Sequence, residues 1–77
     1  MNIDDFIKNI GSVLEETDVN KIKPQTNFRN EIEEWSSFTA FSVIAMVDAE
    51  YNVTIKGEDI RKCHTIEDIF NMVVAKK

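Results

Sequence analysis

Two adjacent serines, Ser36 and Ser37, are the residues of this sequence whose position best suits covalent chemistry. They precede a nearly uncharged run, residues 38–51, which has the length of a helix. Serine is a preferred helix N-cap, so the pair has a structural role open to it. A serine in the first turn also projects its hydroxyl beside the unsatisfied N–H groups at the positive end of the helix dipole. A phosphodiester attached there would be stabilised by the same field, so the pair indicates a cap alone or a cap beside an attachment site.

The only cysteine and the only histidine are also adjacent, at Cys63 and His64. Neighbouring residues on a helix or turn do not face each other, so the two are poorly arranged as a nucleophile and its base. A single cysteine allows neither an intramolecular disulfide nor a cysteine-based zinc site. We expect Cys63 to be a half-buried packing residue and His64 to lie on the surface. An enzyme that uses them is the least favoured function.

Three glutamates precede the serines, at Glu31, Glu33 and Glu34. Such a cluster could serve acid–base catalysis or hold a divalent ion, but the sequence offers no second ligand group beside it. We therefore expect a solvated acidic loop, no metal, and a Trp35 side chain that packs this loop against the following helix.

The 77 residues carry a net charge of −5, and the charge is unevenly distributed. Residues 31–59 contain seven acids and one base, whereas the rest of the chain is nearly neutral. An acidic protein repels phosphate backbones and anionic lipid surfaces, which argues against nucleic acid or a membrane as partner. One acidic surface on a nearly neutral body favours a basic partner, although solubility alone would also explain it.

The N-terminal residues do not form a signal peptide pattern, because Asp4, Asp5 and Lys8 interrupt any apolar run. No stretch approaches the ~20 apolar residues of a membrane span, and an unpaired cysteine suits a reducing compartment. We expect a cytoplasmic monomer.

Hydrophobic spacing predicts a single all-α domain that covers residues 1–77. A first helix is expected over residues 3–16, followed by a polar stretch over residues 17–34 that is held by a few apolar anchors. The second helix begins at the serines and ends near Tyr51. A short helix over residues 58–62 and a last helix from Ile66 complete a small four-helix bundle with three main helices, a short third helix and a long loop between the first two. The core candidates are Phe6, Ile10, Phe41, Ile44, Ile69 and Phe70.

The order and spacing of these features resemble the acyl carrier protein family of stand-alone bacterial type. In that family an Asp-Ser-Leu motif opens the second helix. Further matches are an acid and an aromatic residue at the end of that helix, a short extended stretch, and a threonine that opens the last helix. The corresponding residues here are Ser36-Ser37-Phe38, Glu50-Tyr51, Val53-Thr54-Ile55 and Thr65-Ile66-Glu67-Asp68, with Thr26-Asn27-Phe28 in the preceding loop.

The resemblance implies that a phosphopantetheinyl transferase transfers 4′-phosphopantetheine from coenzyme A to Ser37. The arm would hold an acyl or aminoacyl group as a thioester for the acyl-transferring or condensing enzymes of a lipid, polyketide or related pathway. The protein would then catalyse nothing itself. Few acids in the second helix, with Ser42 where an acid is often found, favour a specialised carrier over the general fatty-acid carrier.

Partner recognition is expected from the second helix and nearby acids, with Ala40 on the same face. The expected recognition residues are Ser36, Phe38, Thr39, Val43, Met46, Val47, Glu34, Asp48 and Glu50. Two residues depart from the family motif, since Ser36 replaces its aspartate and Phe38 its leucine. The first departure motivates an alternative function, a carrier-fold interaction module that is not phosphopantetheinylated.

Overall fold

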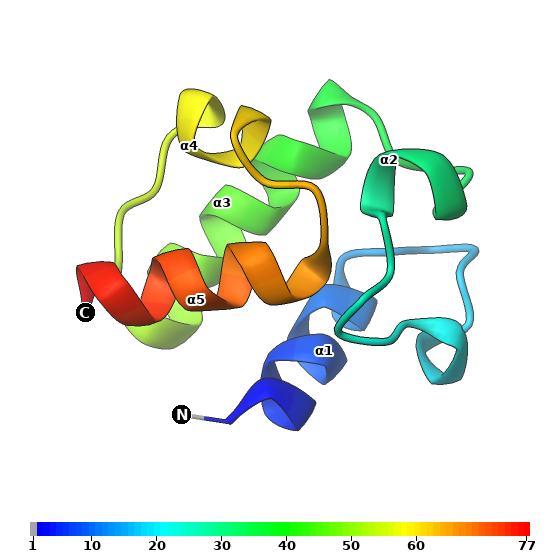
Figure 1. Ribbon diagram of the computed structural model, residues 1–77, viewed down its shortest axis with the longest axis horizontal. Coiled ribbons are helices and arrows are strands. Elements are labelled where there is room, and N and C mark those ends of the chain that lie inside the picture. Colours follow the sequence, from blue (N-terminus) through cyan, green and yellow to red (C-terminus); the bar gives the residue numbers. More distant parts are fainter. Residues whose placement is uncertain (1) are drawn as a thin grey trace.

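Five α-helices and one 3₁₀ turn build the domain in a computed structural model that describes residues 2–77 (Figure 1). The elements are α1 (Ile3–Ser12), the 3₁₀ turn η1 (Val19–Lys21), α2 (Phe28–Glu31), α3 (Ser37–Tyr51), α4 (Gly57–Arg61) and α5 (Ile66–Lys76). The described residues form no strand, and an isolated bridge between Asn27 and Thr65 is their only β-type pairing. The predicted all-α fold with three main helices is therefore confirmed. None of the described helices combines the length and the apolar character that crossing a membrane would need.

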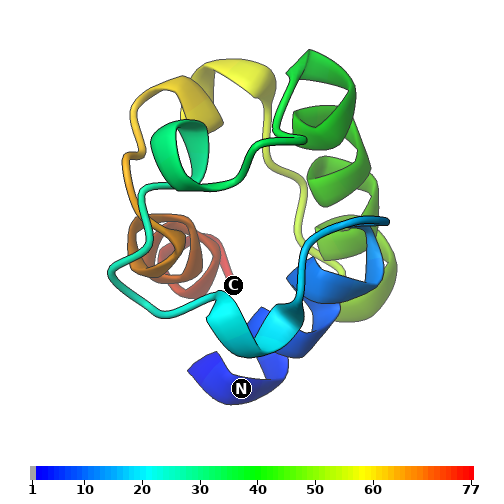
Figure 2. The same ribbon diagram turned by 90° about the vertical axis from the view of Figure 1, so that its right-hand side faces the viewer.

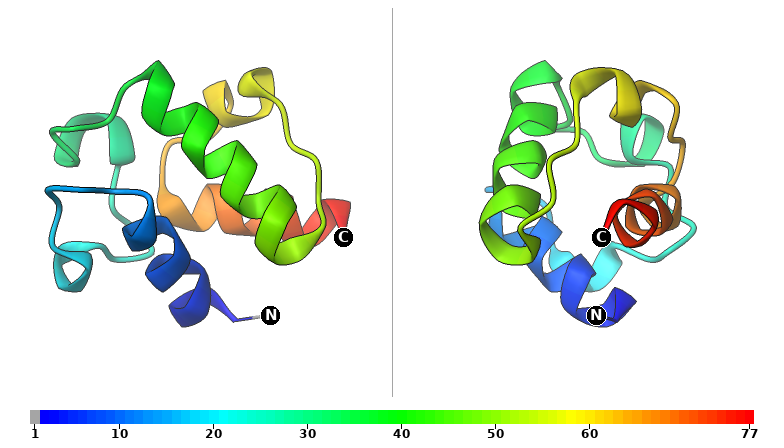
Figure 3. Two further views of the ribbon diagram at one scale, coloured as in Figure 1. Left: turned by 180° about the vertical axis from the view of Figure 1, so that it is seen from behind. Right: turned by 90° about the vertical axis from the view of Figure 1, so that its left-hand side faces the viewer.

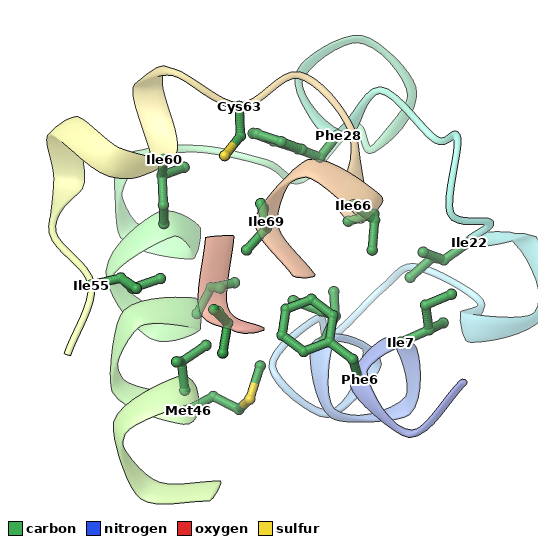
Figure 4. Packing of buried hydrophobic residues seen from close by; sticks show 14 of the residues in the cluster. Phe6, Ile7, Ile22, Phe28, Met46, Ile55, Ile60, Cys63, Ile66 and Ile69 are labelled. Atoms are coloured by element: carbon green, nitrogen blue, oxygen red, sulfur yellow. The ribbon is translucent and has the colours of Figure 1, made fainter. Parts of the chain in front are cut away.

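The three long helices surround the core, and α4 closes one edge. Figure 2 shows α3 and α5 on opposite sides of the molecule, with α4 above and α1 below them, and the opposite view in Figure 3 agrees. Phe6 and Ile69 lie in the packed core in Figure 4. These two residues and Ile10 are fully buried as predicted, whereas Ile44 and Phe70 are only partly buried.

Helix α1 begins as the sequence predicts and ends earlier. The Asn2 side chain accepts a hydrogen bond from the amide of Asp5, which caps the first turn. The helix ends at Ser12 rather than at residue 16. The amides of Glu15 and Glu16 donate to a side chain of the following loop instead of to helix carbonyls, so the helix cannot continue.

The long connection between α1 and α3 is ordered by apolar anchors. The expected anchors are Ile22, Phe28 and Ile32, which are buried in the core. The short helix α2, which the sequence did not predict, is capped by the Asn27 side chain. Two amides of α5, those of Ile66 and Glu67, donate to carbonyls of this connection and fix it against the last helix.

Helix α3 turns a different face inward from the one we expected. Phe41, a core candidate, is 65% exposed, and Phe38 is 69% exposed. Val43, Met46 and Val47, which were expected to form the recognition face, are buried instead. The prediction of the helix phase was wrong because the run is apolar nearly all round, so hydrophobic periodicity did not define its buried side. A helix that is apolar nearly all round cannot be fully covered in so small a domain, and two of its rings are accordingly exposed.

Candidate functional site

Ser36 forms the N-cap of α3. Its backbone is extended, and its Oγ accepts a hydrogen bond from the amide of Thr39 at 3.3 Å. The Thr39 hydroxyl accepts in return from the Ser36 amide at 3.2 Å and donates to the Glu34 carbonyl at 3.0 Å. This reciprocal pair is a capping box, so the capping role that the sequence left open to either serine belongs to Ser36. Both side chains are thereby held in place at the start of the helix.

Ser37 is the first residue of α3 and remains exposed. Its hydroxyl makes no hydrogen bond with any residue in the range 2–77, whereas that of Ser36 is committed to the cap. The Ser37 hydroxyl therefore lies at the positive end of a helix of 15 residues and is open to solvent. The two serines thus differ, since Ser36 occupies the cap position and Ser37 leaves its hydroxyl exposed.

A pocket of about 400 Å³ opens beside Ser37, between the N-terminal half of α3 and the short helix α4. Figure 3 shows α4 next to this part of α3. Apolar atoms contribute most of its lining, and the polar residues are two serines and two arginines. The lining residues are Arg29, Trp35, Ser36, Ser37, Ala40, Phe41, Ile44, Gly57, Ile60 and Arg61.

Arg29 fixes the far wall of the pocket. Its Nη1 donates to the Cys63 carbonyl at 2.6 Å and its Nη2 to the Ile60 carbonyl at 2.9 Å. The guanidinium also lies 4.7 Å from the ring centroid of Phe28. The side chain thus joins α2 to the C-terminal end of α4, where the helix carbonyls favour a positive charge.

Trp35 borders the pocket on the loop side. Its ring packs against Phe28 with centroids 4.4 Å apart. This contact lies within the connection itself, so the expected packing of Trp35 against the following helix stays a prediction. As the only tryptophan in the chain, it also provides a spectroscopic probe of the pocket.

Among residues 2–77, Cys63 and His64 make no hydrogen bond with each other. Cys63 is buried, more deeply than expected, and its Sγ contacts the Asp59 carbonyl at 3.4 Å. Burial, aided by the charge of Asp68, raises the pKa of this thiol, so it is a poor nucleophile. His64 is exposed as predicted, and its amide donates to the Asp68 carboxylate.

The acidic loop is only partly solvated. Glu34 accepts hydrogen bonds from the amides of Glu15 and Glu16, both at 2.9 Å, and from the Thr17 hydroxyl at 2.6 Å. The Thr17 hydrogen bond and these amides lower the pKa of Glu34. This carboxylate therefore takes part in ending α1, and its expected role in partner recognition stays a prediction.

The remaining acids divide into structural and exposed groups. Glu31 accepts from the Asn27 amide at 2.7 Å, while Glu33 is exposed. Asp48 and Glu50 are exposed on the second half of α3. Across residues 2–77, no group of histidine, cysteine and acidic side chains is arranged to hold a metal ion.

The pocket itself was not predicted from the sequence. Arg29 and Arg61 lie far apart in the chain, and only the fold brings both to one pocket. A signal was present, because these two arginines flank the acidic segment 31–59 on either side. The sequence does not give the position of α4, however, so it could not predict that both arginines line the same pocket as Ser37.

Fold and site together define a small helical domain with an exposed serine at the start of its longest helix and a pocket beside it. A scan against protein-family models finds no match for this chain, and a search of curated proteins finds none either.

Proposed function

We propose that this protein is an acyl or aminoacyl carrier that holds its group as a thioester on a 4′-phosphopantetheine arm attached to Ser37. Coenzyme A is the source of the arm, and a phosphopantetheinyl transferase attaches it. Enzymes of a lipid, polyketide or related pathway then act on the carried group, and the carrier itself catalyses nothing. The observation that carries the proposal is the exposed Ser37 hydroxyl, which lacks any hydrogen bond within residues 2–77, at the N-terminus of α3.

The resemblance in sequence and the helix order support the same function. Three main helices, a short helix before the last one and a long first connection follow the pattern that the resemblance implies. The capping box also removes the competing role for Ser37, because Ser36 and Thr39 satisfy the helix end without it.

Partners are proposed to dock on the exposed face of α3. Phe38 and Phe41 project from its first half, and Asp48 and Glu50 lie on its second half. An apolar area bordered by acids fits an enzyme surface with an apolar groove and a basic rim. Val43, Met46 and Val47 support this face from inside the core and do not contact the partner.

The test is modification in vitro. The protein is incubated with coenzyme A, Mg²⁺ and a transferase of broad specificity, and intact-mass spectrometry detects the added phosphopantetheine. We expect one group per chain, none in Ser37→Ala, and retained modification in Ser36→Ala, which is the matched control. No added mass, under conditions that fully modify an established carrier, would overturn the proposal and favour the unmodified interaction module.

A further inference from the structure

The pocket beside Ser37 has a charge opposite to that of the molecule. The chain carries 14 acids and nine bases, yet the pocket lining contains two arginines and no acid. Random placement of charge in so acidic a protein would favour a carboxylate there. A cationic pocket next to the proposed attachment point therefore favours an anionic group as its occupant.

Neither arginine is neutralised by a carboxylate. The ion pair present among residues 2–77 joins Lys76 to Asp59, at 3.6 Å, outside the pocket. Arg29 is held by two backbone carbonyls, which orient its guanidinium but leave its charge uncompensated. Arg61 is exposed on α4 and makes no side-chain hydrogen bond within the described part of the chain. Its guanidinium is thus available to an anion.

The remaining surfaces of the pocket are apolar. Trp35, Phe41 and Ile44 contribute aromatic and aliphatic walls, and the volume of about 400 Å³ exceeds what a phosphate or carboxylate alone would fill. A ligand that fits all of the lining has an anionic end and an aliphatic part. Ser37 itself lines this pocket, so a group attached to the Ser37 hydroxyl is close enough to enter the pocket.

We propose that this pocket binds an anionic group delivered by the Ser37 arm, with Arg61 as the residue that contacts its oxygens. The inference rests on the proposed carrier function and names the chemistry of what is carried. The anion has two possible sources, the phosphodiester of the arm and a carboxylate at the far end of a dicarboxylic acyl group. Arg61 is a binding residue here and takes no part in catalysis.

The experiment compares three loaded forms of the full-length protein. Ser37 is modified with coenzyme A, butyryl-coenzyme A or glutaryl-coenzyme A, and mass spectrometry confirms each product. Tm and Trp35 fluorescence are then measured for the parent, for Arg61→Gln and for Lys62→Gln. Lys62 is the matched control, because it is an exposed neighbouring cation outside the pocket lining.

We expect an anionic group to raise Tm by about 2–6 °C and to shift Trp35 emission, since one partly exposed charge-assisted contact has this effect in a domain of such size. The gain should vanish in Arg61→Gln, persist in Lys62→Gln and fall with added salt. An equal gain in all three loaded forms identifies the phosphodiester as the anion. A gain confined to the glutaryl form identifies the carboxylate.

Two negative outcomes are distinct. Complete loading with no Arg61-dependent change in Tm or fluorescence overturns this inference and leaves the carrier function intact. Failure to load any of the three groups, while an established carrier is loaded, overturns the carrier function and this inference with it.

Discussion

At the scale of single residues, Ser36 and Ser37 differ in what their hydroxyls already do. Ser36 caps α3, so Ser36→Ala should cost about 1 kcal/mol of unfolding free energy. Ser36→Asp introduces the acid found in the motif of the family that the sequence resembles, and it should add about 0.3–1 kcal/mol through the helix dipole. It should also speed modification by a transferase adapted to ordinary carriers. Denaturant unfolding and time-resolved mass spectrometry measure the two effects, and a slower Ser36→Asp variant would show that the motif's aspartate is not needed here.

Glu34 gives the protein a defined dependence on pH. The Thr17 hydroxyl and neighbouring amides lower the pKa of this carboxyl in the folded state below that in the unfolded chain. Its stabilising contribution is therefore present at neutral pH and lost as the pH falls below ~4, through the lowered pKa. We expect Glu34→Gln to have a lower Tm at pH 7 and a shallower fall of Tm between pH 6 and pH 3.

Glu33→Gln is the control for this measurement. It makes the same change in net charge on an exposed side chain that has no hydrogen bond within residues 2–77. Parallel Tm–pH curves for Glu34→Gln and the parent would contradict the role assigned to Glu34.

At the scale of elements, the buried face of α3 decides which substitutions unfold the domain. Met46 is buried, so Met46→Ala should cost about 2–5 kcal/mol. Phe41→Ala removes an exposed ring and should change stability by no more than about 0.5 kcal/mol. Denaturant midpoints measured in parallel check the contrast. A strongly destabilised Phe41→Ala with an unaffected Met46→Ala would mean that α3 is rotated from the orientation described here.

The elements also show where sequence reasoning succeeds and fails. Helices with one apolar stripe, such as α1 and α5, were placed with their buried residues Phe6, Ile10 and Ile69. The position of helix α3 in the sequence was predicted correctly, but its buried face was not. The reason is that apolar residues surround this helix on nearly all sides. The end of α1 was misplaced because a distant residue, Glu34, terminates it. Local patterns therefore predict helices and caps, whereas tertiary contacts determine phase, some helix ends and the pocket.

At the scale of the whole molecule, the acidic segment 31–59 should steer a basic transferase toward Ser37. The double variant Asp48→Lys, Glu50→Lys should slow modification about 2–10-fold at low salt, through the association step. Added salt should slow modification of the parent and reduce the difference in modification rate between the parent and the double variant. The reason is that exposed charges are screened over ~8–10 Å.

Asp4→Lys, Asp5→Lys provides a charge-matched comparison at the N-terminal end of α1, which lies away from the start of α3 in Figure 1. Its modification rate should remain close to that of the parent. Equal slowing by the two double variants would show that overall charge matters and that the position of the acids does not.

The connection between α1 and α3 takes part of its hydrogen bonding from the last helix, with consequences for how the chain folds during synthesis. The carbonyls of Pro24 and Thr26 accept from the amides of Glu67 and Ile66, which emerge from the ribosome some forty residues later. Until then these two carbonyls lack the partners that they have in the finished domain, although Glu34 already ties the connection to the end of α1. We therefore expect the first half of the chain to reach its final form only once α5 has left the exit tunnel, which would place the proposed modification of Ser37 after that moment.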